Sequence, residues 1–99
     1  MSTQEAPEIA IKVRIRGLVQ GVWFRAWTVE QASKRRLRGW VRNRRDGSVE
    51  ALFVGPAAAI DDMIAACWDG PPSARVETVD PEPAKPSADL TGFVTLHTE

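Results

Sequence analysis

Hydrophobic side chains occupy every second position between residues 9 and 16, and all four of them are β-branched. Because successive side chains of a strand point to opposite faces, this alternation predicts a strand with one buried face. A chain of 99 residues is too short for two separately stable cores, so we expect one domain built around this strand. The hydrophobic positions are Ile9, Ile11, Val13 and Ile15, and the intervening ones are Ala10, Lys12, Arg14 and Arg16.

Two further segments have the character of helices. Residues 22–37 contain neither glycine nor proline and fit one helix, although their hydrophobic stripe is imperfect. In the second segment, Pro56 suits a first helical turn, and Gly70 followed by two prolines would end the helix. Hydrophobic residues between these bounds recur at helical spacing and form one apolar face. They are Ile60, Met63, Ile64, Cys67 and Trp68.

The remaining segments predict four more strands. Residues 40–54 are typical of two strands joined by an Asp-Gly turn, because glycine takes a positive φ without steric cost. Residues 74–80 and 92–97 supply the others, with a proline-rich loop at residues 81–86 between them. The order is β-α-β-β-α-β with a short final strand. This pattern predicts an α+β, ferredoxin-like βαββαβ sandwich, in which two helices cover one face of an antiparallel sheet.

Composition narrows the classes of protein. The single cysteine, Cys67, cannot form an intramolecular disulfide, and with His97 it does not make a zinc site, so we expect no metal and no cofactor. No apolar run approaches the roughly 20 residues of a membrane helix, and the N-terminal residues do not resemble a signal peptide. We therefore expect a cytoplasmic, monomeric protein with a disordered tail at residues 1–8 and one domain at residues 9–98.

The net charge of zero hides an uneven distribution. Residues 1–50 hold eleven Lys and Arg against five Asp and Glu, whereas residues 51–99 hold two against eight. Much of the positive charge lies between Arg35 and Gly47. It forms either a solvated basic face or an electrostatic funnel for a small anion or a nucleic acid, and composition leaves both open.

The stretch GLVQGVWFR, residues 17–25, links the first predicted strand to the first predicted helix. A break at this point leaves backbone N–H groups without obligatory partners, and Gly17 and Gly21 allow them to converge into an anion-binding nest. The helix N-terminus adds positive potential, and Arg25 could grip two phosphate oxygens. The Gly-Lys-Ser/Thr ending of a P-loop is missing. A tight turn followed by an exposed arginine is the alternative.

Asn43 stands where the second predicted strand enters its turn. An asparagine at such a place often hydrogen-bonds only the local backbone. In the predicted sheet, however, the end of this strand and the first loop can lie at the same edge. The side-chain amide of Asn43 would then face the bound anion and could hold a water in line with phosphorus.

Four stretches of the chain resemble the acylphosphatase family. GLVQGVWFR at residues 17–25 and GWVRNRRDGSVEA at residues 39–51 resemble its two signatures, in the right order and spacing. GPPSARVETV and GFVTLHT, at residues 70–79 and 92–98, are similar to its third stretch and its closing strand, so the resemblance covers about residues 9–98. The chain departs from the family at Leu18, where Arg or another polar residue is usual, and at Arg36, where glycine is frequent.

The resemblance implies the ferredoxin-like fold and the hydrolysis of acyl phosphates to a carboxylate and inorganic phosphate. It implies that Arg25 binds the phosphate and that Asn43 orients the attacking water. The backbone amides of the loop would bind the phosphoryl oxygens; this loop consists of Gly17, Leu18, Val19, Gln20, Gly21 and Val22. The conjugate acid of the carboxylate leaving group has a pKa of about 4 to 5, so this group leaves without protonation and no general acid is expected. No metal is implied. Inorganic phosphate would inhibit as a product analogue.

Two other functional classes stay open. One is a non-catalytic phosphate-binding module, and the other is an RNA-binding module, which often has this fold. RNA-binding modules stack bases on aromatic side chains of the sheet, and the outward positions of the first predicted strand offer none. We therefore expect a small-molecule acyl phosphate as the partner rather than a nucleic acid or a membrane. Trp23 or Trp27 could border the site and contact the acyl group.

Overall fold

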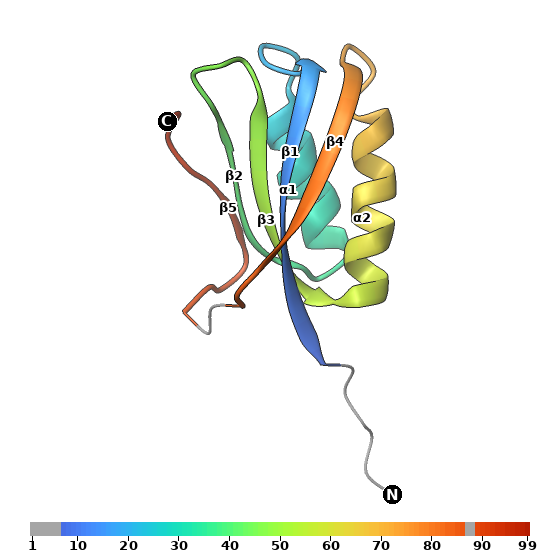
Figure 1. Ribbon diagram of the computed structural model, residues 1–99, viewed down its shortest axis with the longest axis vertical. Coiled ribbons are helices and arrows are strands. Elements are labelled where there is room, and N and C mark those ends of the chain that lie inside the picture. Colours follow the sequence, from blue (N-terminus) through green and yellow to red (C-terminus); the bar gives the residue numbers. More distant parts are fainter. Residues whose placement is uncertain (1–6, 87–88) are drawn as a thin grey trace, which may run out of the picture.

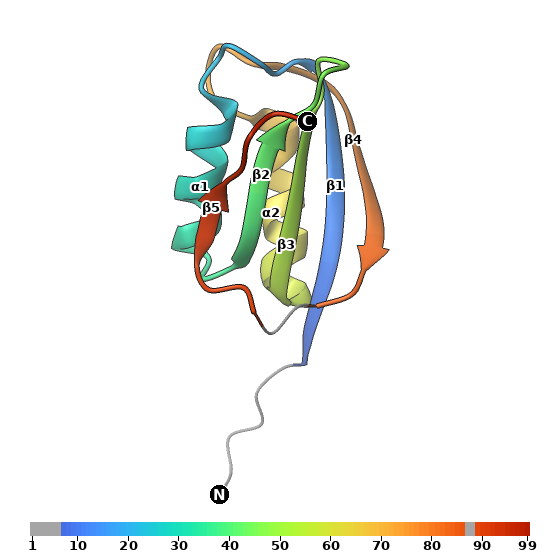
Figure 2. The same cartoon turned by 90° about the vertical axis from the view of Figure 1, so that its left-hand side faces the viewer.

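The computed structural model describes residues 7–86 and 89–99. Its strands form one sheet, in the order β4-β1-β3-β2-β5, and both helices pack against the same face of that sheet (Figures 1 and 2). This arrangement confirms the predicted ferredoxin-like α+β sandwich. In chain order the elements are β1 (Glu8–Leu18), α1 (Phe24–Lys34), β2 (Arg38–Asn43), β3 (Val49–Pro56), α2 (Ala57–Asp69), β4 (Arg75–Ala84) and β5 (Phe93–Thr95).

The sheet is antiparallel except at one edge. β1 pairs with β3 and β4, and β3 pairs with β2, all in antiparallel register. The short final strand β5 instead joins β2 in parallel, which makes the sheet mixed. The direction follows from the path of the chain, because β4 ends at the end of the sheet where β2 begins.

Two predicted boundaries differ from the observed ones for physical reasons. β4 continues through Pro81 and Pro83, which had been expected to lie in a loop. Both prolines are compatible with a strand here because β4 is at the edge of the sheet, where a missing N–H breaks no ladder. β1 begins at Glu8, inside the expected tail, and residues 1–6 of that tail lie outside the described residues.

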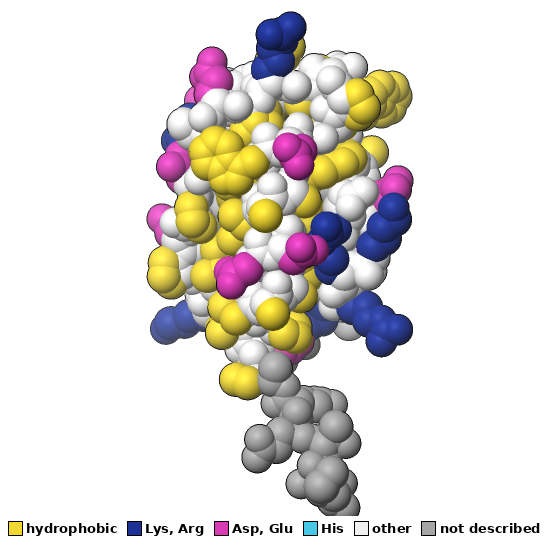
Figure 3. Space-filling view, turned by 90° about the vertical axis from the view of Figure 1, so that its right-hand side faces the viewer, with side chains coloured by type: hydrophobic (Ala, Val, Ile, Leu, Met, Phe, Trp, Pro, Cys, Tyr) yellow, Lys and Arg dark blue, Asp and Glu magenta, His cyan; other side chains and the backbone are white. Residues whose placement is uncertain are grey.

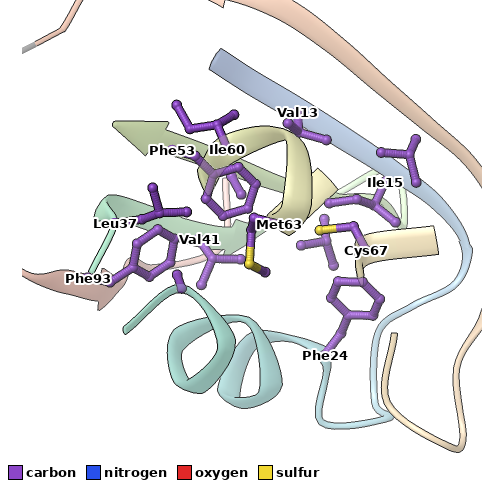
Figure 4. Packing of buried hydrophobic residues seen from close by; sticks show 14 of the residues in the cluster. Val13, Ile15, Phe24, Leu37, Val41, Phe53, Ile60, Met63, Cys67 and Phe93 are labelled. Atoms are coloured by element: carbon purple, nitrogen blue, oxygen red, sulfur yellow. The ribbon is translucent and has the colours of Figure 1, made fainter. Parts of the chain in front are cut away.

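The core lies between the sheet and the two helices (Figure 4). Ile60, Met63 and Cys67 of α2 are fully buried in it, as the helical spacing predicts, whereas the Trp68 side chain is 51% exposed. Burial raises the pKa of the Cys67 thiol to about 12, so Cys67 serves as a core residue and not as a nucleophile. The other labelled core residues are Val13, Ile15, Phe24, Leu37, Val41, Phe53 and Phe93.

Helix α1 is shorter than the predicted 22–37 because both of its ends are set by residues with positive φ. At the C-terminal end, Leu37 N–H donates to the Ala32 carbonyl and Arg36 N–H donates to the Ser33 carbonyl, each at 3.0 Å. This is the Schellman pattern, which requires a left-handed residue at Arg36, where φ is 57°. The requirement explains why glycine suits this position better than arginine.

Replacing Arg36 with glycine should raise the free energy of unfolding by roughly 0.5 to 1 kcal/mol. Glycine removes the steric cost of the left-handed backbone, and this gain exceeds the extra entropy that it loses on folding. Urea denaturation followed by circular dichroism measures the change. Arg35→Gly is the control, since Arg35 has φ −92° and bonds Asp62 at 2.8 Å; that variant should be less stable. A lower unfolding midpoint for Arg36→Gly would contradict the argument.

Candidate active site

The loop after β1 and the turn between β2 and β3 lie at the same end of the sheet (Figure 1). Gly17 still belongs to β1 and has φ 125°, and a Cβ on it would stand 2.2 Å from the Arg75 carbonyl oxygen. Glycine is therefore needed here because β4 comes so close. Gly21 has φ 74° in open space, so there the requirement is conformational. The loop proper runs over residues 19–23, so it begins two residues later and ends one residue later than the sequence predicts.

The backbone of this loop offers several unused donors. In the described part of the chain, the N–H groups of residues 19–23 donate no backbone hydrogen bond. The first bond of helix α1 runs from Trp27 N–H to the Trp23 carbonyl at 3.0 Å, so the N–H groups of the first turn are also open. Donors gathered at a helix N-terminus favour an anion.

Gln20 ties the loop to the turn between β2 and β3. Its side-chain Nε2 donates to the carbonyl oxygens of Arg44, at 2.7 Å, and Ser48, at 2.8 Å. Both amide hydrogens are therefore used to hold two segments together. The sequence reasoning considered only the backbone of Gln20 and missed this role. A long polar side chain within an otherwise apolar loop was the signal that could have indicated it.

Arg25 is the second residue of α1 and is partly buried. Among residues 7–86 and 89–99, the guanidinium of Arg25 has neither an ion-pair partner nor a hydrogen-bond partner. An unpaired guanidinium that is partly removed from water favours binding an anion.

Asn43 ends β2, and its side-chain Oδ1 is buried with no hydrogen-bond partner among the described residues. The expected alternative, in which this oxygen would accept a hydrogen bond from a local backbone N–H, is therefore not formed. The backbone of Asn43 is held in place, since its carbonyl accepts from Glu99 N–H at 3.1 Å. The C-terminal segment that provides this bond runs up beside β2 (Figure 2). A buried acceptor without a partner costs about 1 to 3 kcal/mol and indicates a ligand or water.

A pocket of about 460 Å³ brings these groups together. Arg25 and Asn43 both line it, with Val19 and Gly21 from the loop. The predicted convergence of loop, arginine and asparagine is therefore present in the structure. Gly17, Leu18, Gln20 and Val22 are not among the lining residues, which also include Trp23, Phe24, Ala26 and Thr95.

The two candidate tryptophans near the site differ. Trp23 lines the pocket and is 81% exposed. Trp27 instead packs against Phe24, with ring centroids 5.2 Å apart, and does not line the pocket. Thr95 of β5 also lines the pocket, although nothing in its sequence context had indicated this.

Several basic residues that could have formed a funnel instead take part in ion pairs on the open face of the sheet. Glu50 accepts from Arg42 at 2.8 Å, from Arg14 at 3.3 Å and from Arg44 at 3.5 Å. Burial alone would raise the pKa of Glu50, but the hydrogen bonds from Arg42 and Arg14 outweigh it and hold the pKa below its usual range. Arg16 likewise pairs with Asp80 at 2.9 Å. These pairs favour the solvated-face interpretation for this part of the positive charge.

The described residues lack the features of two other classes of site. No helix there is long and apolar enough to cross a membrane. No group of three or more His, Cys, Asp and Glu side chains in the same residues is arranged to hold a metal ion.

Fold and pocket together define a ferredoxin-like domain whose pocket is lined by Arg25 and Asn43. A profile of the Acylphosphatase family matches residues 11–95. An acylphosphatase of Rhizorhabdus wittichii is 55% identical over 83 residues, which cover 83% of this chain and 84% of the relative. One of Rhodospirillum rubrum is 58% identical over 81 residues, 82% of this chain and 88% of that relative.

A solved structure agrees with these sequences. The crystal structure of acylphosphatase from Bacillus subtilis superposes with a TM-score of 0.85 at 33% identity, over 89% of this chain and 98% of that chain. The present chain belongs to the acylphosphatase family of enzymes.

Replacing Glu50 with glutamine should lower the free energy of unfolding at pH 7 by about 2 to 3 kcal/mol, because it leaves three arginines without their shared carboxylate. A carboxyl with a lowered folded-state pKa stabilises the fold above its unfolded pKa of about 4.3 and loses that effect as the pH falls through the folded value. The gap between wild type and Glu50→Gln should therefore close in acid. Urea titrations at pH 7 and below pH 4 measure it.

The matched control for this experiment is Asp80→Asn, which breaks an ion pair whose two side chains are 49% and 61% exposed. That change should cost under about 1 kcal/mol at either pH. A gap for Glu50→Gln that stays constant between neutral and acidic pH would refute the role given to the buried carboxylate.

Proposed function

We propose that this protein is a metal-independent acylphosphatase that hydrolyses the carboxyl-phosphate anhydride bond of small acyl phosphates. The observation that carries the proposal is the pairing of two unsatisfied groups in one pocket. One is the Arg25 guanidinium, and the other is the buried Oδ1 of Asn43. A cation and a polar amide beside open backbone N–H groups are what a phosphoryl group and an attacking water need.

The phosphoryl oxygens bind to the loop and to Arg25. N–H groups of residues 19–22, the part of the predicted loop that lies outside β1, donate to these oxygens, as do those of the first turn of α1. The planar guanidinium of Arg25 bonds two oxygens at once and stabilises the charge that develops on them. Gln20 acts indirectly, because it holds the loop in the geometry that this binding requires.

Asn43 positions the water. Its Oδ1 accepts a hydrogen bond from the water, so the water oxygen is held in line with the bond that breaks. The end of β2 is a rigid place for this group, since it is hydrogen-bonded in the sheet and tied to the C-terminal segment.

The bond changes need no further catalytic side chain. The water oxygen forms a bond to phosphorus while the bond from phosphorus to the acyl oxygen breaks, and the carboxylate leaves without a proton. The water proton passes to the phosphoryl group, and the products are a carboxylate and inorganic phosphate. The lining of the pocket contains no Asp, Glu, His or Lys, which fits a mechanism without a protein acid or base.

Arg25, Asn43 and the loop, which are the groups that the proposed mechanism uses, all belong to one chain. We therefore propose that the monomer is active on a free small molecule, and that phosphate competes with the substrate. The arginines on the open face of the sheet form ion pairs with Glu50, so we do not expect them to bind a nucleic acid.

Hydrolysis of benzoyl phosphate with EDTA present tests the proposal. Arg25→Ala should lower kcat/KM by about a thousandfold or more, and Arg25→Lys should recover little, because a point charge cannot replace a planar fork. Asn43→Ala should lower kcat by roughly a hundredfold, with little effect on inhibition by phosphate. Arg36→Gly, which removes the same charge at the other end of α1, is the control. Near-normal turnover in a folded Arg25→Ala or Asn43→Ala variant would refute the assigned roles.

Gln20→Leu should weaken competitive inhibition by phosphate about tenfold and lower kcat/KM by roughly ten- to a hundredfold. The change leaves two carbonyl oxygens without donors and frees the loop from the neighbouring turn. Gln31→Leu, on the same helix as Arg25 but bonded only to Arg35, is the matched control. Hydrogen exchange should become faster at the loop amides and stay unchanged in β1. Equal phosphate inhibition in both variants would show that Gln20 does not position the loop.

A further inference from the structure

Trp23 combines two costly features at the mouth of the pocket. Its side chain is 81% exposed, more than any other large hydrophobic side chain in the described part of the chain. Its backbone has φ 67° and ψ 20°, the left-handed conformation that bulky residues rarely adopt. Trp23 does not belong to the hydrophobic core, so core packing does not explain why it stands there.

The pocket that Trp23 borders is lined by both polar and apolar residues. Arg25, Asn43 and Thr95 supply the polar groups, while Trp23, Val19, Phe24 and Ala26 supply the apolar ones. Two other hollows in the described residues differ, because charged side chains dominate their lining. An unpaired arginine and a large aromatic side chain therefore meet in the same pocket.

A second exposed tryptophan provides a comparison. Trp68 lies on the outer face of α2, is 51% exposed and lines none of these hollows. On that face, hydrophobic side chains are mixed with acidic ones (Figure 3). Exposure alone does not make a binding site, and Trp68, unlike Trp23, does not share the lining of one of these hollows with an arginine.

We propose that Trp23 forms a subsite for the acyl group and that the enzyme prefers aromatic acyl phosphates to acetyl phosphate. This inference rests on the function proposed above. Only one residue, Phe24, lies between Trp23 and Arg25 in the chain, and in an acyl phosphate only one oxygen lies between phosphorus and the acyl carbon. When the phosphoryl group binds Arg25, an aromatic acyl group packs against the indole ring and gains contact area that acetyl does not offer.

The test compares kcat/KM for benzoyl phosphate and for acetyl phosphate on the same enzyme. The ratio should fall about tenfold in Trp23→Ala, stay near that of wild type in Trp23→Phe, and not change in Trp68→Ala. Because a ratio is compared, a general loss of activity cancels. If the alanine variant folds poorly, Trp23→Gly replaces it, since glycine adopts φ 67° freely. An unchanged ratio in Trp23→Ala, or an equal fall in Trp68→Ala, would overturn the proposal.

Binding without turnover separates this proposal from the function it rests on. Calorimetry with phenylphosphonate and with inorganic phosphate should give wild type an advantage for the phenyl compound that Trp23→Ala loses. If wild type hydrolyses neither acyl phosphate but keeps this advantage, the subsite stands and the proposed hydrolysis fails. If both substrates are hydrolysed and the ratio of their kcat/KM values is the same in wild type and Trp23→Ala, the proposed hydrolysis stands and the subsite fails.

Discussion

The position of β3 between β1 and β2 is the constraint on which the site depends. Since β3 is antiparallel to both neighbours, β1 and β2 run in the same direction and finish at the same end of the sheet. Adjacent strands lie about 4.8 Å apart, so these two ends are separated by roughly 10 Å. That distance is short enough for one long side chain and one phosphate-sized ligand to bridge. The two hydrogen bonds of Gln20 span this gap and bring the loop to the side of Asn43.

The two faces of the sheet divide the charge of the molecule in a way that composition does not reveal. Alternate residues of β1, β3 and β2 enter the core, and the residues between them form a row of Arg14, Glu50 and Arg42 on the open face. The buried Glu50 carboxylate pairs with its arginine neighbours there, and Asp46 and Glu99 pair with two of the same arginines. Arg25 lies on α1, on the opposite side, and keeps its charge unpaired within the described residues. A chain without net charge can thus still present a cation to a ligand.

The local sequence pattern was sufficient to predict the features that depend only on residues close together in the chain. The alternation in β1, the apolar face of α2 and the Asp-Gly turn predicted the element order, and the element order placed Arg25 and Asn43 at one edge. The parallel pairing of β5, the passage of β4 through Pro81 and the side-chain bonds of Gln20 depend on which segments become neighbours. None of these has a periodic signal. The left-handed backbone of Trp23 was missed for the same reason, because no glycine marks it.

Strain by itself would not have located the site, as the two non-glycine residues with positive φ make clear. Arg36 has φ 57° because a Schellman motif ends α1, and the hydrogen bonds of that motif account for it. Trp23 has no such local explanation. It lines a pocket in which a buried amide oxygen and a guanidinium also lack partners among the described residues. Each of these features has a free-energy cost that the fold alone does not offset, and a ligand that satisfied all three would remove the cost at once. In the mechanism that we propose, an acyl phosphate would do so, because its phosphoryl group would bind Arg25, the attacking water would bind Asn43, and its acyl group would cover Trp23.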